Sequence, residues 1–178
     1  PGDTAGVIRL KTDTSDKYVA IANDCNNRYC HVNPRRGGII AIAECMRNLV
    51  CVGATPLAMT NNLNFGNPYN PEIFYMFREA VTGLSEACKH FDLPVIGGNV
   101  SLYNQGPEGS IDPTPVVSLA GLIDRSDMVT TRDVKDGSEI LLLLGGFPYE
   151  LGASFYLETQ HGLKTGDAPE IDLNFAGS

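Results

Sequence analysis

The sequence predicts an α+β fold in which helices cover one face of a β-sheet. Three observations carry this prediction. Short runs of strand-forming residues, separated by turn residues, recur along the first 124 residues. Two longer segments between them repeat their apolar residues with the period of a helix. The resulting order is two strands, a helix, a strand, a helix and two further strands, which is the pattern of a layered sheet-and-helix domain.

The composition is that of a folded, acidic protein. Hydrophobic residues make up 43% of the 178 residues, and 21 acidic against 13 basic residues give a formal charge of -8. An acidic surface repels a phosphate backbone, so we expect no nucleic-acid partner. No apolar run reaches the roughly 18 to 20 residues of a membrane helix. The first residues also lack a signal-peptide pattern, so we expect a cytoplasmic protein without a membrane partner.

The cysteine pattern favours reduced thiols. The five cysteines are odd in number and form no CxxC pair. Cys25 and Cys30 enclose four residues, which is a poor match to the spacings of zinc sites. A cytosolic protein with free thiols is therefore the favoured interpretation, and a zinc or redox protein is the alternative.

The first strands are expected at residues 6–11 and 17–23, on either side of a polar turn. A polar stretch follows the second strand, and Pro34-Arg35-Arg36-Gly37-Gly38 punctuates the chain. Residues 39–52 are nearly all apolar except for three polar residues at helical spacing, so they predict a helix that presses against the sheet. Gly53 is expected to end this helix.

A strand is expected at residues 55–64, where it becomes more polar toward its end. Asn70-Pro71-Glu72 is a strong helix start, with Asn as the cap and Pro in the first turn. The apolar stripe that follows continues to Phe91. His90 lies in the last turn, where a cation suits the helix dipole, so a capping role is favoured over catalysis.

The remaining elements complete the sheet and then leave it. Residues 93–96 predict a buried strand, 105–111 a loop and 116–123 another strand. Such a sheet has too few strands to close alone, so its uncovered face needs a partner. Residues 124–136 form a charged connector, beyond which a strand from residue 139 and a short helix at 150–158 are expected.

The connector is the best candidate for a domain boundary. We expect one subdomain at residues 1–132 and the truncated start of a second at residues 133–178. The tail shows no obvious final element. The chain is therefore interpreted as a fragment of a longer protein.

Three polar segments follow strands, at residues 24–28, 61–67 and 97–101, and the last two contain glycine. Side chains at strand ends converge readily in a layered fold, so these segments could build one site. Gly97 and Gly98 lack a Cβ, which lets backbone N–H groups approach a phosphate; a bulge or tight bend is the alternative.

Individual side chains in these segments have both a binding and a structural interpretation. Asn99 offers a neutral oxygen to Mg²⁺, and Ser101 points to the same side of a strand. Asn67 before Pro68 fits a turn. Asn61, Asn62 and Asn64 fit a strand poorly, which favours a ligand role for at least one.

Asp24 and Arg28 leave the same choice open, because Asp24 could bind metal or cap a turn. Arg28 could hold an anion or form a salt bridge. The sequence contains no Walker A, GxGxxG or GxSxG pattern, and its three histidines form no recognisable catalytic set. The residues thus predict a nucleotide- or phosphate-binding module without a visible general base.

Several of these segments resemble the phosphoribosylformylglycinamidine synthase family, and more closely the second of its two homologous halves. The resemblance rests on five stretches that span most of the chain. They are DCNNRY at residues 24–29, NNLNFGNP at 61–68, GGNVSLYN at 97–104, PTPV at 113–116 and ELGAS at 150–154.

The resemblance implies an ATP-dependent C–N ligase of purine biosynthesis. The family converts formylglycinamide ribonucleotide to formylglycinamidine ribonucleotide with ATP, Mg²⁺ and ammonia that the glutaminase part draws from glutamine. The implied fold is the N-terminal subdomain of the aminoimidazole ribonucleotide synthetase superfamily, in which two sheets pair into a barrel, plus the start of the α/β C-terminal subdomain. The first half of the enzyme, or a second copy of this chain forming a dimer, would supply the missing sheet.

The resemblance also implies roles for four residues. Gly98 and Asn61 match ATP-contacting positions, Asn99 a Mg²⁺ ligand and Ser101 a contact to the ribonucleotide. Many relatives have Asp where this chain has Asn61. The family's catalytic His lies in the first half, so this chain is expected to be inactive alone. The alternative is a non-catalytic half-domain that binds a nucleotide for structure or assembly.

Overall fold

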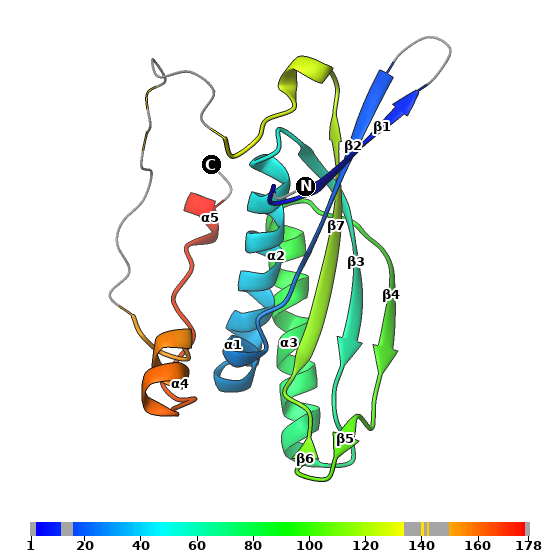
Figure 1. The fold of residues 1–178 in the computed structure, drawn as a ribbon. Helices are drawn as coiled ribbons and strands as arrows, with labels where there is room; N and C mark the ends of the chain where they lie inside the picture. The colour runs from blue at the N-terminus through cyan, green and yellow to red at the C-terminus, as the bar shows by residue number, and fades with distance from the viewer. Residues whose placement is uncertain (1–2, 12–15, 134–139, 141, 143–149, 177–178) are drawn as a thin grey trace.

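The fold is a five-stranded sheet with helices packed on one of its faces (Figure 1). It is seen in a computed structural model that describes residues 3–11, 16–133, 140, 142 and 150–176. The strand order is β1-β2-β7-β3-β4. The strands are β1 (Gly6–Lys11), β2 (Asp16–Asp24), β3 (Thr55–Asn64), β4 (Val95–Ser101) and β7 (Thr114–Ile123).

Three strands of the sheet have their C-terminal residues at the same end of the sheet. β3 and β4 are parallel, whereas β1–β2, β2–β7 and β3–β7 are antiparallel pairs. β2, β3 and β4 therefore run in one direction, so the last residues of all three, Asp24, Asn64 and Ser101, lie at one end of the sheet. This arrangement confirms the predicted α+β fold with helices on one face.

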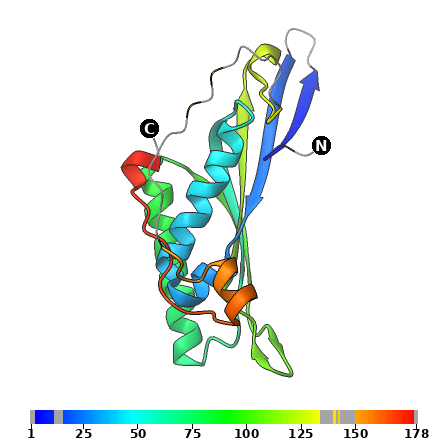
Figure 2. The same cartoon turned by 60° about the vertical axis from the view of Figure 1, so that its left-hand side comes forward.

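The helix layer consists of α1 (Asn27–Val32), α2 (Pro34–Val50) and α3 (Pro71–His90). α2 and α3 lie side by side along the sheet (Figures 1 and 2). They approach closely at Gly83, where a Cβ would collide with the backbone carbonyl oxygen of Arg35. The close contact between α2 and α3 therefore requires glycine at position 83.

The core lies between the helices and the sheet. Every second residue of β7 is buried on the helix side, as the alternation of a strand requires. The largest fully buried side chains of the core come from the strands, from α2 and from residues just after β3 and α2. They are Phe65, Ile42, Leu49, Met59, Leu119, Ile123, Val52 and Val117.

α2 begins earlier than expected. Residues 34–38, which were interpreted as a break in the chain, form its first turns, with the Asn33 side chain accepting a hydrogen bond from the Arg36 N–H at 3.0 Å. Gly37 and Gly38 are in the helix because neighbouring backbone leaves no room for a side chain there.

α1, in the polar stretch after β2, was not predicted. It is capped by the Asn26 side chain.

β4 departs from the prediction of a buried strand at residues 93–96. It spans Val95–Ser101 and lies at the edge of the sheet, with Ile96 73% exposed. The expected polar segment at 97–101 is thus part of the strand itself. Position at the sheet edge is a property of the whole fold, which the local apolar run did not reveal.

The rest of the described chain forms small elements around this domain. A hairpin, β5 (Gln105–Gly106) and β6 (Gly109–Ser110), occupies the predicted loop. After β7 come the 3-10 helix η1 (Ser126–Met128), α4 (Phe155–His161) and α5 (Leu173–Ala176). α4 partly matches the helix expected at 150–158, and α5 was not expected. The strand expected from residue 139, and the point at which a second subdomain begins, fall mostly outside the described residues.

The segment 150–176 packs against the start of the helix layer rather than apart from it (Figure 2). Asp167 accepts hydrogen bonds from Asn33 and Arg36 at 2.9 and 3.0 Å. Lys164 forms an ion pair with Asp112, just before β7. Polar contacts therefore join the parts before and after the predicted division at residues 132 and 133. The division itself stays a prediction.

The other face of the sheet carries no helix from the described residues, and the sheet does not close into a barrel by itself. Apolar side chains are exposed on this face near β1 and β2, with Ile8 56% and Ile21 44% exposed. No helix in the described part of the chain is long and apolar enough to cross a membrane.

Candidate functional site

The candidate site is built on the paired strands β3 and β4. Their parallel register places Asn61 beside Gly98, Asn62 beside Asn99 and Asn64 beside Ser101. All of these residues lie in the second half of β3 or β4, near the end of the sheet where the C-terminal residues of β2, β3 and β4 lie. Of the three segments that were predicted to build one site, 61–67 and 97–101 lie side by side, whereas 24–28 begins at the end of β2, which β7 separates from β3.

The predicted site residues are divided between the two faces of the sheet. Successive side chains of a strand point to opposite faces. Asn61 belongs to the helix face with the buried Met59 and Leu63, and Gly98 is its partner there. Asn99 and Ser101 belong to the open face. A ligand that contacts all four residues must therefore pass around the edge strand β4.

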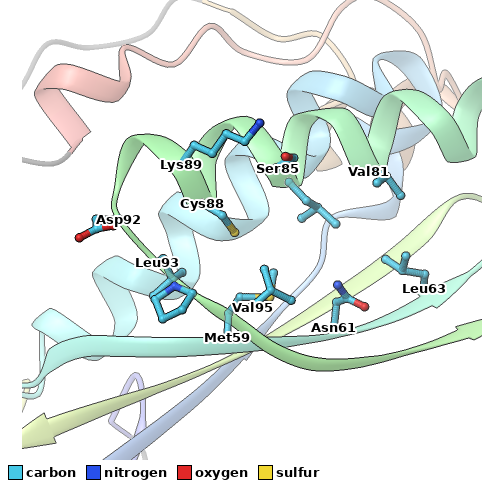
Figure 3. A pocket seen from close by; sticks show the side chains of 12 residues that line it. Met59, Asn61, Leu63, Val81, Ser85, Cys88, Lys89, Asp92, Leu93 and Val95 are labelled. Atoms are coloured by element: carbon cyan, nitrogen blue, oxygen red, sulfur yellow. The ribbon is translucent and has the colours of Figure 1, made fainter.

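A cavity lies on the helix face beside Asn61. It measures about 680 Å³ and opens between α3 and the strands β3 and β4. Figure 3 shows the Asn61 and Val95 side chains rising from the sheet toward α3, from which Cys88 points down. Most residues that line the cavity are apolar, and its polar lining residues include Asn61, Ser85 and Lys89.

The open face carries a row of amides. Asn99 donates a hydrogen bond from Nδ2 to Oδ1 of Asn62 at 2.9 Å. Asn64 donates from Nδ2 to the carbonyl oxygens of Asn62 and Thr114 at 3.0 and 3.2 Å. The orientation of Asn99 leaves its Oδ1 available to a cation or to another donor.

Ser101 is held by a residue that sequence reasoning missed. The Asn104 side chain donates to the Ser101 hydroxyl and to the Ser101 carbonyl oxygen, both at 3.0 Å, and to the Phe65 carbonyl oxygen at 3.1 Å. Asn104 thus joins the loops that follow β3 and β4 and fixes the Ser101 hydroxyl. Its place three residues after Ser101, within the stretch GGNVSLYN at residues 97–104, was the available signal in the sequence.

Asp24 does not join the β3–β4 site. It lies on the helix face beneath α2, where Asn48 donates a hydrogen bond to Oδ2 at 3.2 Å. Burial, followed by the nearby carboxylate of Glu44, raises the pKa of Asp24 to about 6. A backbone hydrogen bond from Cys25 opposes this shift, which agrees with the turn-capping interpretation. No group of three or more His, Cys, Asp or Glu side chains suited to a metal occurs among the described residues.

Arg28 and His31 are also occupied by neighbouring groups. Arg28 pairs with Glu158 at 3.1 Å and stacks over the Phe155 ring at 4.7 Å, so the salt-bridge interpretation holds. His31 lies 3.0 Å from Asp112, counted between Nδ1 and Oδ1. Arg28 thus serves the junction between α1 and the segment after residue 150, whereas His31 joins α1 to the residues just before β7.

The cysteines are free thiols in the structure. Burial raises the pKa of Cys25 to about 11 and that of Cys45 to about 12. A thiol must lose its proton to bind zinc or to attack a disulfide, so these environments disfavour both activities. Cys30, Cys45 and Cys88 are better explained as small core residues, whereas Cys51 is exposed.

The chain is an α+β domain with a mixed sheet and helices on one face, and comparison with known proteins shows its family. Residues 2–123 match the family described as AIR synthase related protein, N-terminal domain. This match covers more than half of the chain, so membership of the family is established.

Over nearly its whole length the chain is similar to phosphoribosylformylglycinamidine synthase subunit PurL. Identity is 47% over 98% of the chain for the protein from Alkaliphilus metalliredigens and 49% over 98% for that from Symbiobacterium thermophilum. The chain spans about a quarter of the length of these relatives, 23% and 26% respectively.

Solved structures show the same relationship. Thermotoga maritima PurL complexed with ATP matches 70% of the chain with 33% identity and a TM-score of 0.63, over 20% of its own length. The complex of the same protein with FGAR matches 67% of the chain with 32% identity and a TM-score of 0.60, over 19% of its length. The fold is also shared by a ThiL protein at 18% identity and a TM-score of 0.52, over 70% of the chain and 37% of its own length.

Proposed function

We propose that the chain is the second homologous half, or part of it, of a phosphoribosylformylglycinamidine synthase, an ATP-dependent C–N ligase. The observation that carries this proposal is the paired arrangement of Asn61 with Gly98 and of Asn64 with Ser101 on neighbouring strands. It brings together the positions that match the family's nucleotide and substrate contacts. The likeness to PurL along the whole chain supports the same assignment.

In this proposal ATP passes around the edge of the sheet at β4. The nucleoside end lies on the helix face beside Asn61, and the phosphates turn past Gly97 and Gly98 toward Asn99 on the open face. Two residues without Cβ leave room for this turn, and an edge strand offers N–H groups that no other strand binds. This path explains why the four matching residues lie on two faces of one strand pair.

The residues on the open face fit Mg²⁺ only as part of a ligand set. Asn99 offers one neutral amide oxygen, and Mg²⁺ prefers six oxygen ligands that include phosphate oxygens and waters. The remaining ligands would come from the nucleotide and from the rest of the longer polypeptide. With ATP bound, the metal would neutralise charge on the phosphates that react.

The chemistry that the family implies is activation of the substrate amide oxygen by ATP, followed by displacement with ammonia. This chain would contribute positioning and hydrogen bonding rather than a base. Ser101, fixed by Asn104, would bind formylglycinamide ribonucleotide. The catalytic His, the glutaminase part and the sheet that faces the open side would come from the first half of the polypeptide or from partner chains.

Substitution in the complete polypeptide tests the proposal. Ser101→Ala and Asn99→Ala should each lower ATP- and substrate-dependent turnover by about 100-fold or more, because positioned donors at charged groups are worth several kcal/mol. Ser126→Ala, on the exposed η1, removes the same hydroxyl at the opposite end of the sheet from Asn64 and Ser101 and serves as the control. Turnover near wild type for both site variants would mean that this half does not take part in the reaction.

One observation favours a second candidate function. The β3–β4 rows contain amides and hydroxyls but no carboxylate among the described residues, so they could hold a nucleotide for stability without supporting phosphate transfer. In that case Asn99→Ala would lower the melting temperature and the amount of nucleotide that copurifies, while turnover of the complete polypeptide would stay unchanged.

A further inference from the structure

Asn104 holds together three segments at the end of the sheet where Ser101 lies. Its backbone N–H donates to the Phe65 carbonyl oxygen after β3, and its carbonyl oxygen accepts from the Ile111 N–H after β6, both at 3.1 Å. Its side chain adds a second bond to Phe65 and two to Ser101. A single turn residue thus uses its backbone and its side chain to fix the surroundings of one hydroxyl.

The neighbouring carbonyl groups decide which way the Asn104 amide points. Its Nδ2 lies 3.1 Å from the Phe65 carbonyl oxygen and 3.0 Å from that of Ser101. Carbonyl oxygens only accept hydrogen bonds, so the end of the amide that faces both of them must be the NH₂ group. The opposite orientation would place Oδ1 against two other oxygens. The direction of the amide therefore follows from the backbone and does not depend on a ligand.

We propose that Asn104 is a positioning residue that makes the Ser101 hydroxyl a hydrogen-bond donor to an oxygen of the ribonucleotide substrate. The inference rests on the proposed function, because Ser101 is the substrate contact of that proposal. It adds the residue that orients Ser101 and the kind of atom that Ser101 binds.

The distances around Ser101 define this role. Its Oγ lies 3.0 Å from Nδ2 and 3.2 Å from Oδ1 of Asn104. A hydroxyl has one proton and two lone pairs, so the bond from Nδ2 occupies a lone pair and leaves the proton to be donated. Without substrate, the proton is donated to Oδ1. A rotation about the Cβ–Oγ bond then turns it toward a substrate oxygen.

Two physical effects favour donation to a ligand. Ser101 is half-buried and its hydroxyl is held from one side, so it loses less rotational freedom when a ligand binds. An oxygen that accepts a hydrogen bond also becomes a stronger donor, because successive bonds polarise one another. Ser101 therefore suits an acceptor with high electron density, such as an amide carbonyl or a phosphate oxygen. Formylglycinamide ribonucleotide carries both.

Binding of formylglycinamide ribonucleotide to the complete polypeptide tests the proposal through a double-mutant cycle. Asn104→Asp keeps the size of the side chain but replaces the donating NH₂ group by an acceptor. With Ser101 present it should raise the dissociation constant about 10-fold or more, because an oriented hydrogen bond to a substrate oxygen is worth about that much. In a Ser101→Ala background the same exchange should change it by less than about 3-fold. Titration calorimetry measures both effects, and the dissociation constant of ATP should stay within about 3-fold of wild type.

Two further variants separate orientation from charge and from folding. Asn67→Asp makes the same exchange in the loop after β3, where Oδ1 accepts from the Tyr69 N–H at 2.9 Å and an aspartate still accepts. It should leave the dissociation constant of the substrate unchanged. Asn104→Ser removes the amide without adding a charge and should show the same dependence on Ser101, so it carries the test if Asn104→Asp does not fold.

Ribose 5-phosphate identifies the substrate oxygen, because it carries the phosphate without the amide. If Ser101 binds the phosphate, Asn104→Ser should weaken competition by ribose 5-phosphate as much as it weakens binding of the substrate. If Ser101 binds an amide oxygen, this competition should stay unchanged.

The outcomes distinguish the inference from the proposed function. Equal losses from Asn104→Asp with and without the Ser101 hydroxyl, or no loss in either background, would overturn the inference, because Asn104 would then only shape the loop. The ligase assignment would still stand if Ser101→Ala lowers turnover. If Ser101→Ala and Asn99→Ala leave turnover unchanged, the proposed function fails whatever the binding measurements show.

Discussion

Asp92 ends α3 in a conformation that suits glycine. Its φ is 50°, and the Leu93 N–H bonds to the Cys88 carbonyl oxygen at 2.8 Å, as in a Schellman motif. Asp92→Gly should stabilise the fold by about 0.5–1 kcal/mol, because it removes the left-handed strain and a negative charge from the C-terminal end of a helix.

Calorimetry measures this effect as a rise in melting temperature of about 2 °C, the shift expected for a chain of this size. Asp92→Ala is the control, because alanine keeps the strain and loses only the charge, so it should be no more stable than wild type. A glycine variant that melts below wild type would contradict the interpretation of this cap.

Asp24 makes stability depend on pH. Burial first, and Glu44 second, raise its folded-state pKa to about 6, above the ordinary unfolded value of about 3.9. The folded state therefore holds the proton more tightly, so stability falls as pH rises from about 4 to about 6 and stays reduced above that range.

Asp24→Asn removes this loss. At pH 7 it should stabilise the fold by about 1–2 kcal/mol, after allowance for the solvent that reaches the half-buried side chain. The gain should vanish below about pH 3, where the wild-type carboxyl is protonated in both the folded and the unfolded state. Urea unfolding at several pH values checks this, and a gain that does not change with pH would show that the carboxylate charge is not its cause.

At the scale of elements, the contact between α2 and α3 depends on Gly83. A Cβ there would meet the carbonyl oxygen of Arg35, which is backbone and cannot move aside as a side chain can. Gly83→Ala should therefore destabilise the fold by about 2–3 kcal/mol despite its better helix propensity. Gly106→Ala is the matched control, because no atom lies within 4 Å of the added methyl group and it should change stability by less than about 0.5 kcal/mol. Equal denaturation midpoints for the two variants would refute a close helix contact.

The two helix starts show what local sequence could and could not predict. Asn70-Pro71 was interpreted correctly as the cap and first turn of α3. The same pair at Asn33-Pro34 opens α2, but the glycines that follow concealed it. Those glycines are needed because Cys30 and the Ala80 carbonyl oxygen lie against the helix, which is a long-range contact that helix propensity does not contain.

The sequence was sufficient to propose which residues form the candidate site, but it did not predict how these residues are arranged in space. Strand-depleted asparagines and paired glycines identified the segments around Asn61 and Gly98. The division of these residues between two faces follows from the register of β3 with β4, and the sequence of one strand does not reveal the register of its neighbour. Asn104 was missed because its three hydrogen bonds join two loops that are far apart in the sequence.

At the scale of the whole molecule, the open face of the sheet changes in character from one end to the other. Near β1 and β2 it exposes apolar side chains such as Ile8 and Ile21. Toward the ends of β3 and β4 it carries amides and hydroxyls, including Asn99 and Ser101. A second sheet placed on this face would bury the apolar part and enclose the polar part, which is consistent with a chain that spans a quarter of its relatives.

The 178-residue chain by itself should therefore associate through the open face, with a second copy taking the place of the missing sheet. Ile21→Lys puts a charge in the centre of the apolar part and should shift sedimentation toward the monomer, because an unpaired buried charge is costly. Val50→Lys, on α2 at a position that is also exposed (58% against 44% for Ile21), should leave association unchanged. A wild-type chain that remains monomeric at concentrations of about 100 µM or more, in the range of weak complexes, would show that this face does not pair with itself.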